Sequence, residues 1–291
     1  MARIRNMTVQ NLKITVLIEN TVRSSKPHLK SKHGLSFFLE AKIDDNNLTM
    51  LMDTGPSPAE LQNNADTLNI KLEDVDAVIL SHGHYDHTGG LIETLKRFKK
   101  QIPVIGHPNL FDAKLKVKPQ LKIIGSPFKR SEIESLGGVP LMATNPIRIA
   151  PGIITTGEIP RITEFESVID FWTIRSNQFI KDLMLDDQSL VINVEDKGLV
   201  ILTGCAHSGI INTIRYAQKI TGKNRVYAVL GGFHLMNIDD KILQLTVDAL
   251  KDFDLSFIGP CHCTGKKAIK NINEVYGEQC VPLHTGDSVE F

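Results

Sequence analysis

The sequence predicts a layered α/β protein with a single domain, and three observations support the class, the size of the core and the domain count in turn. Four times along the chain an apolar, strand-like run leads into a turn that holds Gly or Ser with a histidine, and then into an amphipathic, helix-like segment. Apolar residues make up 42% of the 291 residues, which is ample for a sizeable core. Neither a Gly/Ser-rich nor a charge-block linker divides the chain. We therefore expect a single domain over residues 1–291.

The opening third of the chain reads as strands joined by turns. The segments NLKITVLIEN, LSFFLEAKI and LTMLMDTG are apolar runs with strand-like patterns. Turn residues, Asp44-Asp45-Asn46-Asn47, separate the last two segments. This arrangement predicts a hairpin.

The next stretch alternates between the two kinds of element. Residues 59–70 follow Pro58 with moderate helical spacing, residues 75–82 return to the pattern of a buried strand, and residues 91–100 again show helical spacing. From 101 to 170, Gly and Pro interrupt the apolar runs repeatedly. We expect short strands and long loops there.

The second half repeats one unit three times. The segments DKGLVILTGCAHSG, RVYAVLGGFHL and LSFIGPCHCTG each join an apolar strand to a turn that carries a histidine. Each leads into an amphipathic segment, at 210–220, 239–253 and 266–277. Ser208 and Asp239 are placed to cap the first two helices, and Gly277 to end the third.

These repeated turns have a consequence for function. In layered α/β proteins the loops at the carboxyl ends of strands gather on one rim, where ligands bind. Histidines that are far apart in the sequence are therefore expected to meet in one place.

The segment SHGHYDHTGG at 81–90 places three histidines and one aspartate within six positions. In an extended backbone alternate side chains share a face, so His82, His84 and Asp86 can point the same way, whereas His87 requires a turn. We expect this turn because a helix begins near Thr88. The segment then offers two histidines to one cation and an aspartate with a histidine to a second. Such ligands suit zinc, with manganese or iron as alternatives.

The remaining ligands must come from later loops. His207, His234 and His262 occupy the strand-to-helix turns of the second half, and His107 is a weaker candidate. A single histidine at a strand end is usually a surface or core residue, but six of the ten histidines occupy equivalent loops, which favours a shared site. We expect no role at the site for the remaining three, His28, His33 and His284.

Two further side chains are candidates for the surroundings of the metals. Cys205 lies two residues before His207 and can share its face, so it is a candidate thiolate ligand. Cys261 and Cys263 flank His262 and are expected to face away from the site. Asp53 lies at a strand end within the run LMDTG, where it either caps a loop or accepts a hydrogen bond from a ligand imidazole. We favour the second role, which fixes the tautomer of the histidine.

This inventory favours catalysis over a purely structural role. Two divalent cations roughly 3.5 to 4 Å apart would lower the pKa of a shared water from 15.7 toward about 7, and hydroxide would then be the nucleophile. The alternative is a non-enzymatic protein whose metals staple the fold while its surface binds a ligand. Such sites close their coordination with four protein ligands per ion, and the candidates are too few for two closed sites.

The segment HGHYDH at 82–87, with LMDTG upstream, resembles the signature H-x-H-x-D-H of the metallo-β-lactamase superfamily. The resemblance implies a four-layered αβ/βα sandwich of two mixed β-sheets flanked by helices, with a dinuclear metal site at one edge of the sheets. It assigns His82 and His84 to the first metal and Asp86 and His87 to the second. It also makes His262 a ligand of the second metal.

The middle of the chain departs from the superfamily pattern. There is no histidine between His107 and His207, and TGC replaces the usual TGD, whose aspartate bridges the metals. His207 is expected to substitute for the missing ligand, and Cys205 or a solvent hydroxide to occupy the bridging position. The segments TGCAHSGIINT, GGFHL and GPCHCTG resemble one branch that includes pterin-condensing synthases and metal-dependent hydrolases. In that branch His234 is the candidate for contact with substrate.

Two enzyme activities follow from the resemblance. The first is hydrolysis of a phosphorylated or ester-containing small molecule by metal-activated water. The second is a transferase reaction that condenses a reduced pterin diphosphate with a ribofuranosyl aminobenzene phosphate. Asp86 and His234 are the candidate catalytic residues in either case.

Composition and charge narrow the classes of partner that this protein is expected to bind. Lys plus Arg and Asp plus Glu balance at 33 each, which disfavours nucleic acid and anionic membranes as partners. No apolar run reaches the length of a signal peptide or a membrane span, so we expect a cytoplasmic protein with a small-molecule substrate, and a homodimer is a reasonable default. Residues 112–130 hold six basic residues and one acidic residue. This stretch is either a solvated face or a contact for a phosphate group.

Overall fold

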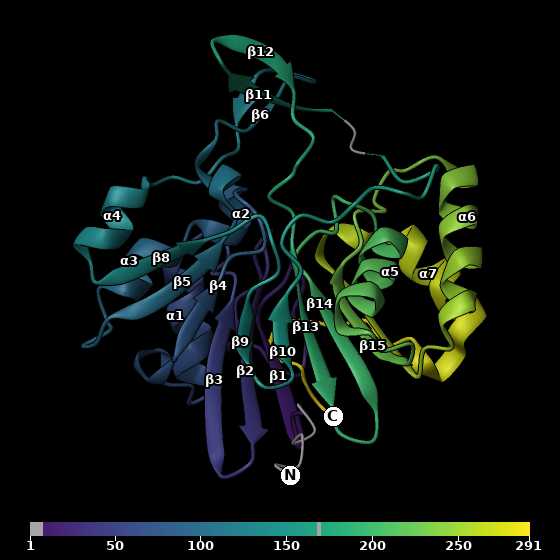
Figure 1. Ribbon diagram of the computed structural model, residues 1–291, viewed down its shortest axis with the longest axis horizontal. Coiled ribbons are helices and arrows are strands. Elements are labelled where there is room, and N and C mark those ends of the chain that lie inside the picture. Colours follow the sequence, from purple (N-terminus) through teal and green to yellow (C-terminus); the bar gives the residue numbers. More distant parts are fainter. Residues whose placement is uncertain (1–7, 168–169) are drawn as a thin grey trace, which may run out of the picture.

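The computed structural model describes residues 8–167 and 170–291, and within them the chain forms four layers in the order helix, sheet, sheet, helix (Figure 1). Both large sheets contain parallel and antiparallel pairs. The predicted class, a four-layered αβ/βα sandwich of two mixed sheets, is confirmed.

The first large sheet is built from the first half of the chain and its last strand. Its strand order is β17-β1-β2-β3-β4-β5-β8. The first four strands in this order pair antiparallel, and β3, β4, β5 and β8 pair parallel. The predicted hairpin joins β2 to β3, where Ile43 pairs with Asn46. The bounds are β1 Asn11–Ile18, β2 Ser36–Ile43, β3 Asn46–Met52, β4 Ala77–Ile79, β5 Ile102–Gly106, β8 Gly138–Met142 and β17 Ser288–Glu290.

The second large sheet is built from the second half, in the order β16-β15-β14-β13-β10-β9. Its parallel strands β14, β15 and β16 are the three apolar runs that the sequence places before histidine-bearing turns. The bounds are β9 Arg148–Ala150, β10 Ile153–Thr155, β13 Ser189–Val194, β14 Gly198–Thr203, β15 Val226–Gly232 and β16 Phe257–Cys261.

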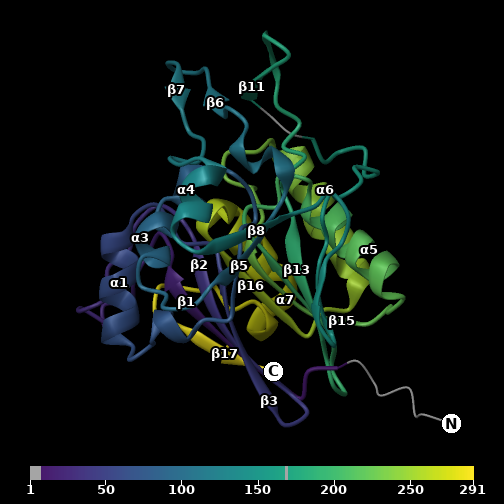
Figure 2. The same cartoon turned by 60° about the vertical axis from the view of Figure 1, so that its left-hand side comes forward.

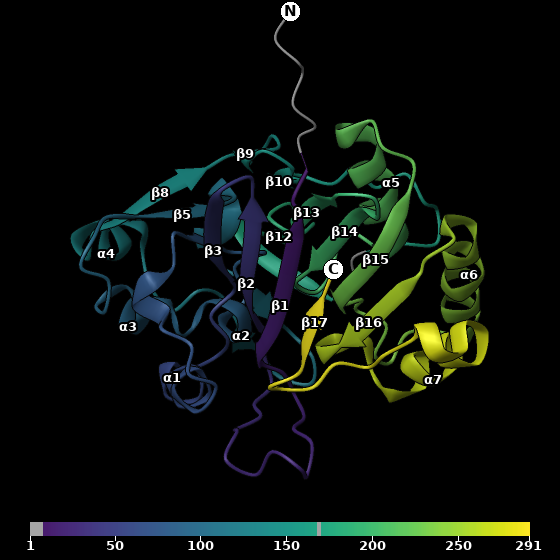
Figure 3. The ribbon, with the colours of Figure 1, turned by 90° about the horizontal axis from the view of Figure 1, so that it is seen from below.

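Helices cover the outer face of each sheet, as Figures 1 and 3 show. The first sheet carries α1 (Pro58–Thr67), α3 (Leu91–Leu95) and α4 (Arg130–Ser135), and the second carries α5 (Ile210–Thr221), α6 (Asp240–Leu250) and α7 (Lys266–Tyr276). A short helix, α2 (Tyr85–Thr88), follows β4. Short 3₁₀ turns lie at Leu72–Asp74, Pro108–Phe111, Lys251–Phe253, His262–Thr264 and Gly277–Gln279.

Among the described residues, one of three apolar clusters lies between the two sheets, and the other two lie between each sheet and its covering helices. Side chains from β1, β2 and β3 meet those from β13, β14 and β15, and Phe37, Leu39, Leu190 and Leu202 are fully buried there. At about 25 cal/mol per Å² of buried apolar surface, this interface stabilises the sandwich. It holds the edges of the two sheets in register, so that loops from both halves share one rim.

Helix ends confirm two of the three predicted signals. The side chain of Asp239 accepts the N–H of Lys241 at the start of α6, and α7 ends at Gly277, which has a φ of 53°. The predicted cap by Ser208 is wrong. Gly209 occupies the cap position of α5, and Glu166 accepts the N–H groups of Ile211 and Asn212 instead. The helix predicted at 91–100 ends earlier, at Leu95.

A small third sheet, which we call the lid sheet, projects beyond the two large sheets (Figure 2). Its order is β12-β11-β6-β7, with bounds β6 Leu115–Lys116, β7 Lys122–Ile123, β11 Phe171–Arg175 and β12 Gln178–Lys181. Strands β6 and β7 come from the basic stretch 112–130, inside the region in which Gly and Pro interrupt the apolar runs, and β11 and β12 follow that region. None of the helices in the described ranges has both the length and the apolarity of a membrane span.

Candidate metal centre

The segment after β4 brings its four candidate ligands to the rim through a combination of loop and helix. His82 and His84 lie in the extended loop, and His84 is the last residue before α2. Asp86 and His87 lie in the first turn of α2, which begins at Tyr85 and not near Thr88. The prediction that Asp86 reaches the site by extended alternation is therefore wrong, because the helical turn carries both Asp86 and His87 inward.

The later loops bring their histidines to the same place. The ring centroid of His207, after β14, lies 4.8 Å from that of His82 and 5.0 Å from that of His84. Nε2 of His262, after β16, lies 3.2 Å from Nε2 of His87. The ring of His234, after β15, lies 4.2 Å from that of His207. Histidines from four strand ends thus form one buried cluster.

The close approach of the two halves depends on a residue without a side chain. A Cβ on Gly204, at the end of β14, would lie 2.0 Å from Oγ of Ser81 and 3.2 Å from Oδ2 of Asp53. Any larger residue there would push the loop that carries Cys205 and His207 away from the loop that carries His82.

His82, His84 and His207 form the first group of candidate ligands. Their ligand nitrogens all lie within 4.8 Å of one another, and Nε2 of His82 is 3.0 Å from Nδ1 of His84. Among the described residues, neither ring nitrogen of the buried His207 has a hydrogen-bond partner, nor has Nε2 of His84. Buried polar nitrogens are rarely left unpaired. A cation bound by the three rings would satisfy them, so this donor set fits a divalent metal.

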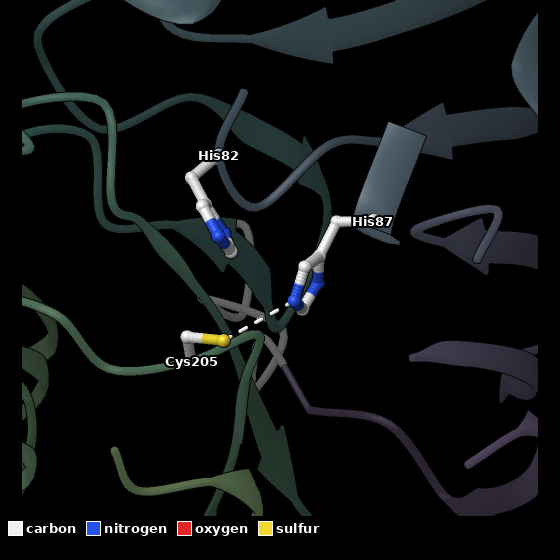
Figure 4. Close-up of side chains that lie close together, drawn as sticks. All are labelled: His82, His87 and Cys205. Atoms are coloured by element: carbon white, nitrogen blue, oxygen red, sulfur yellow. Dashed lines mark hydrogen bonds between the residues drawn. The ribbon is translucent and has the colours of Figure 1, made fainter. Parts of the chain in front are cut away.

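The second group surrounds Nε2 of His87. Oδ2 of Asp86 lies 3.9 Å from Nε2 of His87 and 3.5 Å from Nε2 of His262. Sγ of Cys205 lies 3.2 Å from Nε2 of His87. Figure 4 shows His82, His87 and Cys205 pointing toward one another. Their ligand atoms lie within 4.8 Å of each other. A carboxylate, two imidazoles and a thiol are the donors that zinc prefers.

Asp53 lies behind His87, where the sequence places it. Its Oδ2 is 2.6 Å from Nδ1 of His87 and accepts a hydrogen bond from the hydroxyl of Ser81. Its Oδ1 accepts a hydrogen bond from the backbone N–H of Ser81. On the other side, Oδ1 of Asn20 is 3.0 Å from Nδ1 of His262. Both contacts occupy Nδ1 and leave Nε2 directed at the site, which is how outer contacts orient metal-bound histidines.

The electrostatics separate the two groups. Burial, together with the neighbouring imidazoles and Lys114, holds the pKa of His82 and of His207 well below its usual range, so their rings are neutral and have lone pairs to offer. Burial also disfavours a charged His87, but the carboxylates of Asp53 and Asp86 outweigh it and raise the pKa of His87 to about 9. The same carboxylates favour a metal cation near Nε2 of His87.

A buried ion cluster supports the loop between the first two histidines, and the sequence analysis missed it. The ammonium of Lys114, which is fully buried, lies 2.7 Å from Oδ1 of Asp186 and 3.0 Å from Oδ2 of Asp182. The other oxygen of Asp186 accepts the N–H of Gly83, which lies between His82 and His84. The run DLMLDDQ at 182–188 is dense in aspartate, and this was the one signal in the sequence.

Other residues are placed differently from the expectations. His33, for which no role was expected, has Nε2 3.3 Å from Oδ2 of Asp86 and is half exposed at the edge of the second group. Cys263 does not face away, because His262 has a φ of 50° and begins a 3₁₀ turn. The sulfur atoms of Cys205 and Cys263 and a ring nitrogen of His234 form a third group, in which all three atoms lie within 4.8 Å of one another.

His107 lies outside all of these groups. Its Nε2 is 3.0 Å from Oε1 of Glu158, and its Nδ1 accepts the N–H of Asn109. It belongs to the loop after β5 and not to the cluster, so the weaker candidate of the sequence analysis is not brought to the site.

The lid sheet covers the cluster from one side. The ring of Phe171, the first residue of β11, lies 4.9 Å from that of His84 and 5.0 Å from that of His207. It lies 5.8 Å from the ring of His234. An apolar side chain over three imidazoles limits the access of water to this part of the site.

Comparisons with known proteins agree with this geometry. Residues 33–166 match the family model described as the metallo-beta-lactamase superfamily. The chain is 37% identical, over 97% of its length and 98% of the other's, to the 7,8-dihydropterin-6-methyl-4-(beta-D-ribofuranosyl)-aminobenzene-5'-phosphate synthase of Methanocaldococcus jannaschii. It is 34% identical, over 91% and 96%, to an uncharacterized protein of the same organism. A crystal structure of a metal-dependent hydrolase of the beta-lactamase superfamily superposes with a TM-score of 0.81 at 26% identity, over 96% of this chain and 99% of that one.

The substitution Asp86→Asn tests the second group. It removes a carboxylate that lies within 4 Å of Nε2 of both His87 and His262. Loss of an outer contact typically lowers metal affinity about 10- to 100-fold. We expect loss of Asp86 to lower the affinity for metal at the second group by more than this. Metal content per chain, measured by mass spectrometry, should drop below that of the unsubstituted chain, with unchanged circular dichroism. The exposed Asp66→Asn on α1 is the matched control. Full occupancy in the Asp86 variant would remove Asp86 from the site.

The substitution Lys114→Met tests the buried ion cluster. It leaves Asp182 and Asp186 buried without their cation, so the free energy of unfolding in urea should fall by about 3–5 kcal/mol. Lys100→Met is the control, because Lys100 pairs with Asp76 on the surface and its loss should cost at most about 1 kcal/mol. Equal effects of the two substitutions would contradict a stabilising role for the cluster.

Proposed function

We propose a function from the premise that this chain belongs to the metallo-beta-lactamase superfamily, whose model it matches, and that it is 37% identical to a synthase over nearly its whole length. The proposed activity is a condensation. A reduced pterin that carries a diphosphate is joined to 4-(β-D-ribofuranosyl)-aminobenzene 5'-phosphate, and diphosphate is released.

One observation carries this proposal. The relative that shares 37% identity is named as the synthase of this condensed product, and the alignment covers 97% of this chain. It therefore includes all four histidine-bearing turns that converge at the rim. Of the two activities expected from the sequence, this likeness favours the transferase over the hydrolase.

The proposed ligands follow the two groups of side chains. His82, His84 and His207 would hold one divalent cation, and Asp86, His87 and His262 would hold the other. Cys205 is the proposed bridging or outer ligand, and Asp53 the outer contact that orients His87. Zinc is the proposed metal, with manganese or iron as alternatives. When bound, the two cations supply Lewis-acid stabilisation for the charge that develops on the leaving diphosphate.

His234 is the proposed contact with substrate. Its Nδ1 is buried and without a hydrogen-bond partner among the described residues, and its backbone N–H is fixed by a hydrogen bond to Sγ of Cys263. Burial lowers the pKa of His234, but the sulfur of Cys263 outweighs burial and raises it. Nδ1 can therefore donate a hydrogen bond to the departing oxygen.

The bonds that change can be stated in full. The aminobenzene nitrogen forms a bond to the methylene carbon of the pterin, and the bond from this carbon to the diphosphate oxygen breaks. The electron pair of that bond leaves with diphosphate, and the nitrogen loses one proton to solvent. Phe171 favours this course, because an apolar ring over His84 and His207 keeps water from competing with the amine.

Hydrolysis is the second candidate. The structural neighbour with a TM-score of 0.81 is described as a metal-dependent hydrolase, and the same groups of ligands would serve a reaction in which water replaces the amine. The two activities differ only in the acceptor. Their products therefore distinguish them.

The remaining expectations belong to this proposal as well. The substrate is proposed to be a small phosphorylated molecule, since neither a net charge nor a membrane-spanning helix in the described ranges points to nucleic acid or lipid. A cytoplasmic location, a single domain and a homodimer are proposed as the sequence predicts them.

A product assay tests the proposed function. The zinc-loaded chain is incubated with the reduced pterin diphosphate and 4-(β-D-ribofuranosyl)-aminobenzene 5'-phosphate, and the mixture is examined by mass spectrometry. We expect the condensed product and diphosphate in equal amounts, and a large loss of turnover in His234→Ala with retained metal. Release of diphosphate without a condensed product would assign hydrolysis to the site and contradict the synthase proposal.

A further inference from the structure

Three residues of the lid sheet form a row that runs across neighbouring strands. Phe171 of β11 pairs with Lys116 of β6, and Lys116 pairs with Lys122 of β7. Directly opposite residues of paired strands carry their side chains on the same face of a sheet. The two lysines therefore share a face with Phe171.

This face is the inner one. Phe171 packs against the rings of His84, His207 and His234. Along β11 the faces alternate, and Thr173, on the same face as Phe171, is 2% exposed, whereas Ile174 is 55% exposed. The outer face carries Trp172, with Lys181 placed 4.5 Å over its ring.

The inner face holds lysines in two different electrostatic states. Lys114, two residues before Lys116, is neutralised by the buried carboxylates of Asp182 and Asp186. Within residues 8–167 and 170–291, Lys116 and Lys122 are exposed and form no ion pair with a carboxylate. Two uncompensated cations thus lie beside an aromatic ring that borders the candidate metal centre.

Hydrogen bonds fix this part of the lid sheet relative to the metal-binding loop. The N–H of Tyr85 donates to the carbonyl of Ile124, and Oγ of Ser126 donates to the carbonyl of Gly83. His84 and Gly125 form an isolated antiparallel bridge. Strands in a sheet are about 4.8 Å apart, so the backbone of Lys116 lies one such spacing from Phe171 and that of Lys122 lies two. A substrate that extends from the metal centre past Phe171 meets these lysines.

We propose that Lys116 and Lys122 form an anion-binding subsite that holds a phosphoryl group of the substrate beside the metal centre. Lysine ammonium groups bind phosphoryl oxygens as point charges, and their attraction is strongest where no carboxylate competes. The inference rests on the proposed function for the identity of the substrate. The phosphoryl group held by the subsite belongs either to the pterin diphosphate or to the ribosyl 5'-phosphate.

Kinetics with three variants test the subsite. In Lys116→Ala/Lys122→Ala, the KM of the substrate whose phosphoryl group is held should rise about tenfold or more, because a hydrogen bond to a charged group is lost. Turnover at saturation should change less than twofold. Lys181→Ala, on the outer face of the same sheet, is the matched control and should leave both KM values unchanged. The double arginine variant, Lys116→Arg/Lys122→Arg, should restore most of the affinity.

The two substrates distinguish the sources of the phosphoryl group. A rise in KM confined to the pterin diphosphate assigns the subsite to the diphosphate, and a rise confined to the ribosyl compound assigns it to the 5'-phosphate. Unchanged KM values for both substrates, or an equal rise in Lys181→Ala, would overturn the proposal and make the basic stretch a solvated face.

Binding measurements keep the subsite testable even if no condensed product forms. Titration calorimetry with inorganic diphosphate and inorganic phosphate is carried out on the metal-free and the zinc-loaded chain, with circular dichroism to confirm the fold. A weaker affinity in the double alanine variant, present in both forms and absent in Lys181→Ala, supports the subsite without reference to the reaction. An affinity that depends on metal but not on Lys116 and Lys122 would overturn it.

Discussion

The structure depends on how one buried space accommodates several imidazoles at once. The rings of His82, His84 and His207 are buried with centroids 4.7 to 5.0 Å apart, and the ring of His234 lies 4.2 Å from that of His207. Protonated rings at these distances would repel one another, and neutral rings would leave lone pairs unsatisfied, which is costly inside a protein. A bound cation resolves both problems. The metal centre is in this sense a requirement of the packing and not an addition to it.

The rest of the molecule serves this requirement. The core between the two sheets holds strand ends from both halves at one rim, and Gly204 allows the loop of Cys205 and His207 to approach Ser81 and Asp53. Asp53 and Asn20 orient the rings of His87 and His262. The cluster of Lys114 and Asp186 supports the backbone between His82 and His84, and it joins the lid sheet to the same loop. The inner face of the lid sheet then supplies the surface along which a phosphorylated substrate is proposed to extend.

The sequence predicted the class of fold and the convergence of the histidines, because both follow from a repeated local pattern of strand, turn and helix. It failed where a side chain reaches the site through backbone that breaks the local period. Asp86 arrives on a helical turn, and Cys263 arrives through the left-handed backbone of His262. No local pattern predicted the contacts of His33 and Lys114. Their partners, Asp86 and Asp182, are more than fifty positions away in the sequence and come close only in the folded protein. The lid sheet was hidden for a related reason, because its strands are two to five residues long and its two halves meet only where β6 pairs with β11, more than fifty positions away.

The most direct measurement of the central claim is anomalous diffraction from crystals of the zinc-loaded chain, recorded on both sides of the zinc absorption edge. Two peaks are expected roughly 3.5 to 4 Å apart. One should lie among the ring nitrogens of His82, His84 and His207, and the other among Asp86, His87 and His262. The absence of any peak, or a peak held by other residues with His207 and His262 turned away, would contradict the account.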